Sequence, residues 1–138
     1  MKTNYEAIDK VSFSSEIENL KVAENLVDNI CRSNDVHEDH FGNVLIAVTE
    51  AVNNAIHHGN LEDTTKKVYI DVKRADKDLC FTIRDEGNGF DYNNLPDPTA
   101  PENIEKENGR GIFLMKSLAD DVQFEDNGKE VQVTFSIL

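Results

Sequence analysis

The sequence has no tryptophan, and its 138 residues include only two cysteines and three prolines. Cys31 and Cys80 lie far apart, with no Cys-x-x-Cys pair and no histidine beside them, so neither a disulfide framework nor a zinc site is predicted. No stretch approaches the roughly 20 apolar residues that a membrane-spanning helix needs. The N-terminal residues also lack the apolar run of a signal peptide. We therefore expect a cytoplasmic protein that does not engage a membrane.

Basic residues are scarce as well. Lysine and arginine number 14 against 27 aspartates and glutamates, which gives a formal net charge of −13. Such a field repels phosphate backbones, so no direct binding to nucleic acid is expected. Hydrophobic residues make up 38% of the chain, enough for a folded core rather than a disordered acidic segment. A chain of this length predicts one domain over residues 1–138.

The first half of the chain is typical of helices that follow an edge strand. The mixed polar and apolar residues 5–12 predict that strand. Ser15 followed by Glu18 has the pattern of a capping box, and apolar residues at helical spacing continue to about residue 31. Asp35 predicts the start of a second helix, which Gly59 would end.

The second half predicts strands around one long loop and one short helix. Residues 86–111 contain four glycines and all three prolines, and a loop of this length in a small domain is more often a functional lid than a connector. The order of elements predicts an α+β fold, a two-layer sandwich with a mixed, mostly antiparallel sheet covered on one face by helices. We expect a helix at 112–118 and strands at 68–73, 79–84, 122–125 and 131–137, the last two joined by Asn127-Gly128.

Polar side chains form one stripe along the second predicted helix. At about 100° per residue, Asn54 falls about 40° from Glu50, with His57 near −20° and His58 near 80°. The apolar residues of the helix fall between about 120° and 240°. An ordinary solvated polar face explains this pattern, so the helix alone does not establish a site.

Two glycine-containing segments favour a ligand site. The strand ending at Asp85 is followed by Gly87 and Gly89, and glycine allows a close approach that a Cβ would block. Gly109 and Gly111 lead directly into the short helix, whose free N–H groups suit phosphate. The alternative is a pair of tight turns without a ligand. No P-loop or dinucleotide-binding glycine motif is present.

Taken together, these segments resemble the three nucleotide boxes of the gyrase, heat-shock chaperone, histidine-kinase and mismatch-repair ATPase superfamily, which implies a Bergerat-type ATP-binding fold. The segments are Glu50-Ala51-Val52-Asn53-Asn54-Ala55-Ile56-His57-His58-Gly59, Asp85-Glu86-Gly87-Asn88-Gly89-Phe90 and Gly109-Arg110-Gly111. The small size, the absence of a phosphoacceptor helix pair and the sequence Thr49-Glu50-Ala51-Val52 look most like the anti-sigma-factor serine/threonine kinases.

The resemblance implies ATP and Mg²⁺ as cofactors and a role for each matching residue. Glu50 corresponds to the general base, Asn54 to the Mg²⁺ ligand, and Asp85 to the acceptor of the adenine amino group. An ATP lid is implied at about 92–108. The other implied nucleotide-binding residues are His57, His58, Gly87, Gly89, Phe90, Gly109, Arg110, Gly111 and Ile112.

The resemblance also implies partners. The phosphoacceptor would be a small anti-sigma-factor antagonist, a sigma factor would be the second partner, and a homodimer is usual in the family. One position departs from the family pattern. After the hairpin glycine the family usually has threonine, whereas Lys129 and Glu130 follow Gly128 here.

Two other functions are compatible with the sequence. The first is a regulatory module that binds ATP and a partner without transferring phosphate. The second is an interaction domain that binds no nucleotide and whose glycines only form turns. The presence of both Glu50 and Asn54 favours the kinase, because a pure binding module needs no general base.

Overall fold

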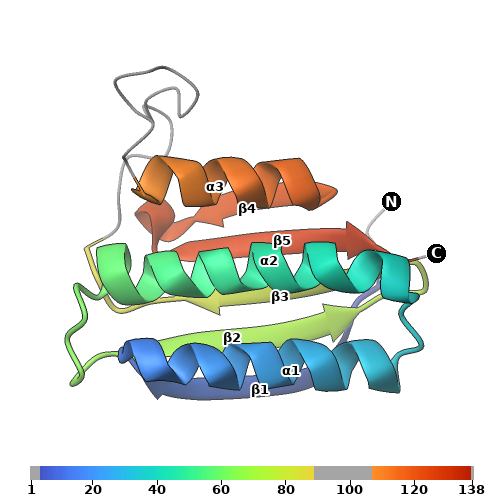
Figure 1. The fold of residues 1–138 in the computed structure, drawn as a ribbon, viewed down its shortest axis with the longest axis horizontal. Coiled ribbons are helices and arrows are strands. Elements are labelled where there is room, and N and C mark those ends of the chain that lie inside the picture. The colour runs from blue at the N-terminus through green and yellow to red at the C-terminus, as the bar shows by residue number, and fades with distance from the viewer. Residues whose placement is uncertain (1–3, 89–106, 138) are drawn as a thin grey trace.

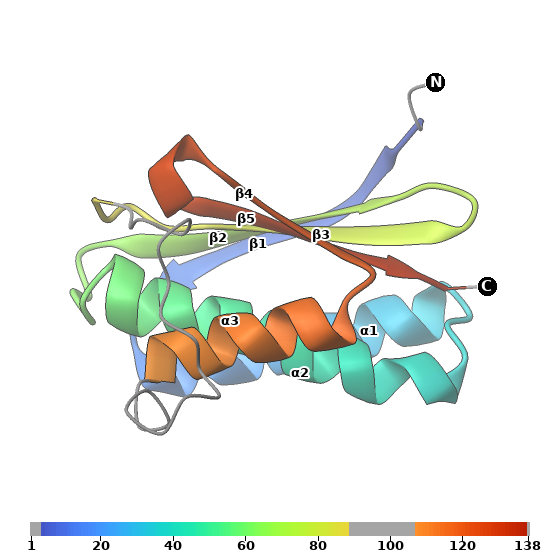
Figure 2. The ribbon, with the colours of Figure 1, turned by 90° about the horizontal axis from the view of Figure 1, so that it is seen from above.

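The computed structural model describes residues 4–88 and 107–137, and it shows a sheet with three helices on one face (Figures 1 and 2). A 3₁₀ turn (Ile17–Asn19) precedes α1, a π-helical turn (Ala55–Gly59) follows α2, and a second 3₁₀ turn (Asp126–Gly128) joins β4 to β5. The main elements are β1 (Glu6–Ser14), α1 (Leu20–Ser33), α2 (Glu38–Asn54), β2 (Lys67–Arg74), β3 (Asp78–Arg84), α3 (Glu107–Leu118), β4 (Asp121–Glu125) and β5 (Glu130–Ser136).

The five strands run in the order β1-β2-β3-β5-β4, and each of these pairings is antiparallel. The predicted α+β sandwich is confirmed, and the predicted edge strand is β1. Its sheet contains no parallel pair among the described strands, although a mixed sheet was expected. The pairs β2–β3 and β4–β5 are each joined by a turn, which is the usual connection between antiparallel neighbours.

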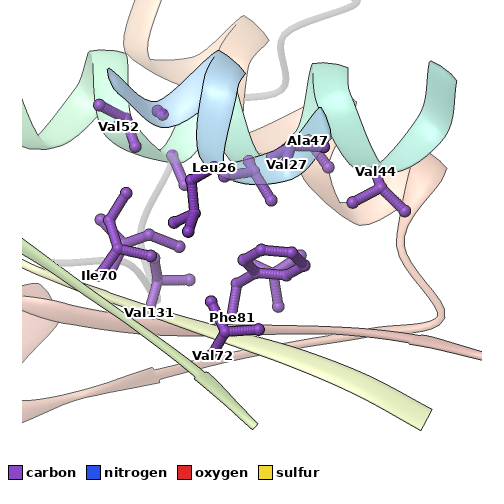
Figure 3. Close-up of a cluster of buried hydrophobic side chains, with 14 of the residues drawn as sticks. Leu26, Val27, Val44, Ala47, Val52, Ile70, Val72, Phe81 and Val131 are labelled. Atoms are coloured by element: carbon purple, nitrogen blue, oxygen red, sulfur yellow. The ribbon is translucent and has the colours of Figure 1, made fainter. Parts of the chain in front are cut away.

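The core lies between the sheet and the three helices (Figure 3). Val27 of α1, Val44 of α2 and Phe81 of β3 are all 0% exposed. Phe81 also packs edge-to-face on Phe135, with ring centroids 6.1 Å apart. Burying side chains of this size stabilises the fold by about 1.5–3 kcal/mol each, so this layer fixes how the helices sit on the sheet.

The predicted capping box at Ser15 is wrong. The Ser15 hydroxyl donates to the Lys66 carbonyl at 2.8 Å, and its N–H donates to the same oxygen at 3.1 Å. Ser15 is therefore tied to the residue before β2, and α1 begins only at Leu20 after the 3₁₀ turn. This partly buried, long-range partner outcompetes the local cap.

The second helix begins three residues later than expected. Asp35 has a left-handed φ of 53° and lies in the turn after α1, where the Val36 N–H donates to the Cys31 carbonyl at 3.0 Å. The residue before α2 is His37, whose Nδ1 accepts from the Asp39 N–H at 3.1 Å. Asp35 thus terminates one helix rather than starting the next, because aspartate tolerates the left-handed conformation. None of the described helices is long and apolar enough to cross a bilayer.

Candidate functional site

A pocket opens between the end of α2, α3 and the ends of β3 and β5. Its walls combine buried apolar side chains with a few polar groups, which is the usual composition of a small-molecule site. The lining residues are Ala51, Asn54, Ala55, His58, Gly59, Ile83, Asp85, Ile112, Met115, Phe124, Gly128, Lys129 and Val131. Four residues expected to bind the nucleotide are among them: Asn54, His58, Asp85 and Ile112.

Asp85 is held at the end of β3 by its own backbone and by the next turn. Its N–H donates to the Lys129 carbonyl at 2.9 Å, and its Oδ1 accepts from the Gly87 N–H at 2.8 Å. Burial raises the pKa of the Asp85 carboxyl, while the Gly87 N–H and the Lys129 charge act in the opposite direction. The pocket therefore contains a fixed acceptor in a partly desolvated position.

Two glycines allow the backbone to close around this carboxylate. A Cβ on Gly59 would lie 2.3 Å from Asp85 Oδ2, and a Cβ on Gly87 would lie 1.9 Å from the Gly59 carbonyl oxygen. A side chain at Gly87 would push the π-helical turn away from the end of β3, and a side chain at Gly59 would displace the Asp85 carboxylate. From the sequence, Gly59 was expected only to end a helix. Its position in the same box as Glu50 and Asn54 was the available signal for a second role.

Glu50 and Asn54 meet α3 at Gly111. A Cβ on Gly111 would lie 2.9 Å from Glu50 Oε2 and 3.2 Å from Asn54 Oδ1. Both side chains are half-buried, so this side of α2 is not the open solvated face that its helical pattern also allowed. The Asn54 Nδ2 is fully buried, and the described residues offer it no hydrogen-bond partner. One turn of helix thus presents a carboxylate and a carboxamide beside the pocket.

The expected glycine loop before α3 is helical in the structure. The helix begins at Glu107 rather than Ile112, so Gly109, Arg110 and Gly111 lie in its first turns and Arg110 is exposed. Ile112 and Met115 are only 3% and 1% exposed. Their burial outweighs the helix cost of about 1 kcal/mol per glycine, and Gly111 lets α3 approach α2 closely. The predicted helix start, with its anion-binding N–H groups, is therefore wrong: α3 begins about one turn earlier in the chain.

The structure separates the two histidines of the first box. His58 lines the pocket, whereas the Nδ1 of His57 lies 3.3 Å from Glu62 Oε2 and His57 does not line it. Consecutive residues of a helix point about 100° apart, so the two side chains leave the turn in different directions. Gly89, Phe90 and most of the predicted lid at 92–108 lie outside the described residues; positions 107 and 108 are helical.

Lys129 occupies the position where threonine was expected and lines the pocket beside Asp85. It follows a turn in which Asp126, Asn127 and Gly128 all have left-handed φ values of 51°, 57° and 88°. The predicted Asn-Gly turn between the last two strands is confirmed. This turn places the Lys129 carbonyl on the Asp85 N–H, so the departure from the family pattern falls inside the site.

Comparison with known proteins identifies the family of the chain. A model of the histidine kinase-like ATPase domain matches residues 13–135. The serine-protein kinase RsbW of Bacillus cereus is 33% identical over 103 residues, which is 70% of this chain and 64% of that protein. RsbW of Bacillus anthracis matches to the same extent. The chain thus spans 64% of the length of these curated relatives.

A solved structure shows the same fold. The RsbU and RsbW domains of a Mycobacterium tuberculosis protein superpose with a TM-score of 0.65 at 12% identity, covering 97% of this chain and 31% of that one. The resemblance to the anti-sigma-factor serine kinases is confirmed by the RsbW relatives. With Asn54 and Asp85 brought to one pocket and the family match extending over both layers of the sandwich, the chain belongs to the histidine kinase-like ATPase domain family.

Proposed function

We propose that the chain is an ATP-dependent serine/threonine kinase that phosphorylates a small anti-sigma-factor antagonist. One observation carries this proposal: a half-buried carboxylate, Asp85, shares the pocket with Asn54, and Glu50 lies one helical turn before Asn54. The similarity to relatives named serine-protein kinases supports it. A site that only bound nucleotide would not need a carboxylate next to the metal-binding position.

Adenine would occupy the apolar part of the pocket. Ile83, Ile112 and Met115 are buried and line it, so they offer surfaces for the two faces of a planar base. Asp85 would accept a hydrogen bond from the 6-amino group, because its carboxylate is fixed by the Gly87 N–H. A hydrogen bond made in a partly desolvated pocket gains strength, which would select adenine over bases that present an oxygen there.

The residues beside the pocket fit a magnesium ion. Mg²⁺ prefers oxygen ligands, and Asn54 supplies an amide oxygen next to its buried, unpartnered amide nitrogen. Asn54 would hold the ion, and bound Mg²⁺ would neutralise the charge of the phosphate oxygens during transfer. Glu50 would take the proton from the acceptor hydroxyl. Gly111 would keep α3 from displacing these two side chains.

The proposed partners follow from the resemblance to the anti-sigma-factor kinases rather than from a surface motif. The hydroxyl would belong to a serine or threonine of the antagonist, a sigma factor would be the second partner, and the assembly would be a homodimer. The experiment that tests the function uses the full chain, ATP labelled on the γ-phosphate, and a candidate antagonist encoded by a neighbouring gene. We expect Mg²⁺-dependent labelling of that protein. ATP-dependent binding of the antagonist without labelling would instead support the non-catalytic module. Failure to bind a fluorescent ATP analogue would contradict both the kinase and the non-catalytic module.

Asp85→Asn is expected to weaken binding of ATP and ADP alike by about 1–3 kcal/mol, the effect of one mismatched buried polar group. Asparagine keeps an oxygen but also presents an NH₂ group that can face the adenine amino group. Calorimetric titration measures both affinities. Asp71→Asn, on an exposed position of β2 away from the pocket, is the matched control.

The same substitution should stabilise the nucleotide-free protein. Burial raises the pKa of the Asp85 carboxyl in the folded protein, so folding disfavours its charged form. The free energy of unfolding of the wild type therefore falls as the pH rises from the pKa of Asp85 in the unfolded chain to its higher pKa in the folded protein. Asparagine removes this loss at neutral pH. Urea unfolding at pH 7 should therefore show a higher free energy of unfolding for Asp85→Asn.

Unchanged affinities for ATP and ADP in Asp85→Asn would show that Asp85 does not bind the adenine base.

A further inference from the structure

Asn60 is a buried polar residue immediately after the π-helical turn. Its side chain is 0% exposed, although it carries two amide donors and a carbonyl acceptor. Burying such a group without hydrogen bonds costs about 1–3 kcal/mol, so a buried carboxamide indicates a specific set of partners. The function proposed above does not use Asn60 itself.

The Asn60 carboxamide joins three segments that are far apart in the sequence. Its Nδ2 donates to Ser15 Oγ at 2.7 Å and to the Lys67 carbonyl at 3.0 Å. Its Oδ1 accepts from the Glu86 N–H at 2.8 Å. The side chain therefore ties the end of β1 and the start of β2 to the residue that follows Asp85.

The bond to Glu86 acts on the orientation of Asp85. The Glu86 N–H belongs to the peptide group whose carbonyl is that of Asp85, so fixing this N–H fixes the plane of that peptide. Gly59, the residue before Asn60, lies against the Asp85 carboxylate, and the Glu86 carboxylate accepts from the Lys67 N–H. Asn60 thus holds the backbone from which the proposed adenine acceptor projects.

We propose that Asn60 is a positioning residue that sets the preference of the pocket for adenine by orienting Asp85. The inference rests on the proposed function, because it requires that Asp85 accepts from the 6-amino group. Inosine triphosphate provides the matched probe, since it carries an oxygen where ATP carries that amino group. Correct orientation of Asp85 favours ATP and places two acceptors face to face with the inosine nucleotide.

The experiment measures the dissociation constants of ATP and inosine triphosphate by calorimetry, together with urea unfolding. Asn60→Ala removes the Glu86 contact, and Asn60→Asp keeps the acceptor for the Glu86 N–H while losing the two donors. Ser15→Ala removes a partner of Asn60 but leaves the Glu86 contact in place. Asp85→Asn reports whether base recognition uses Asp85 at all.

We expect the ratio of the two affinities to fall about tenfold in Asn60→Ala. The ratio should stay at the wild-type value in Ser15→Ala despite a loss of stability, and Asn60→Asp should restore most of it. A merely structural Asn60 would lower both affinities together and leave the ratio unchanged.

Three results would contradict either the role of Asn60 or the role of Asp85, and each result identifies which of the two is wrong. An unchanged ratio in folded Asn60→Ala, with a reduced ratio in Asp85→Asn, overturns the role of Asn60 and leaves the proposed function intact. An unchanged ratio in Asp85→Asn overturns the adenine assignment itself. If Asn60→Ala does not fold, Asn60→Ser replaces it, because serine is too short to reach the Glu86 N–H. Failure of both to fold shows that Asn60 supports the fold alone and overturns the inference.

Discussion

Glu50→Gln is expected to leave ATP binding unchanged and to slow phosphate transfer about 10²–10⁴-fold. Glutamine preserves the size of the side chain and its hydrogen bonding but cannot take a proton from the acceptor hydroxyl. The exchange fits beside Gly111, because that glycine has no side chain and glutamine has no more heavy atoms than glutamate. Initial rates of label transfer at saturating ATP, together with calorimetric ATP titration, measure the two effects separately.

Asn54→Ala should fail in a different way. Removing the proposed metal ligand should weaken Mg²⁺-dependent ATP binding along with transfer. The free energy of unfolding should change by no more than about 0.5 kcal/mol, because the Asn54 amide nitrogen has no hydrogen bond within the described part of the chain. Asn53→Ala is the matched control, since Asn53 is equally half-buried on the same turn but does not line the pocket.

These kinetic tests need a genuine acceptor, because an absent substrate would make every variant inactive. Equal transfer rates for the wild type and Glu50→Gln would show that Glu50 is not the base. If the wild type binds the antagonist only with ATP present and transfers nothing, the non-catalytic module is the correct function. The outcome of Asn54→Ala then still reports whether binding depends on the metal.

Local patterns were sufficient to predict most of the fold. Alternation in β5 placed Val131, Val133 and Phe135 on the core face, and all three are buried. The helical spacing of α1 and α2 was equally informative, because both helices bury one apolar side against the sheet. These signals succeed because side-chain direction repeats every two residues in a strand and about every 3.6 in a helix.

Contacts between distant segments were beyond such patterns. Ser15 looked like a helix cap, yet its partner Lys66 lies 51 positions away. Gly109 and Gly111 looked like a loop, and only the packing of α3 on α2 makes them helical. Three boxes in order were enough to bring Asn54 and Asp85 to one pocket. The same boxes gave no signal that His57 would turn to Glu62 instead.

Gly87→Ala is expected to destabilise the protein by about 3 kcal/mol and to abolish ATP binding. The added Cβ would lie 1.9 Å from the Gly59 carbonyl oxygen, a backbone atom that cannot rotate away as a side chain would. Relief of this overlap requires the π-helical turn to separate from the end of β3, which moves Gly59 away from the Asp85 carboxylate. Overpacking of this kind typically costs about 1–3 kcal/mol, and a backbone partner places it at the upper end.

Gly42→Ala provides the opposite control for that substitution. Gly42 lies in α2 with nothing within 4 Å of an added Cβ, so alanine should raise the free energy of unfolding by about 0.5–1 kcal/mol through its higher helix propensity. Urea unfolding and ATP titration of the two variants separate a steric role from a general effect of replacing glycine. Wild-type stability and ATP binding in Gly87→Ala would mean that the π-helical turn and β3 do not need this close contact. Loss of stability and of ATP binding in Gly87→Ala, together with a gain of stability in Gly42→Ala, would show that the pocket keeps its shape only when residue 87 has no side chain.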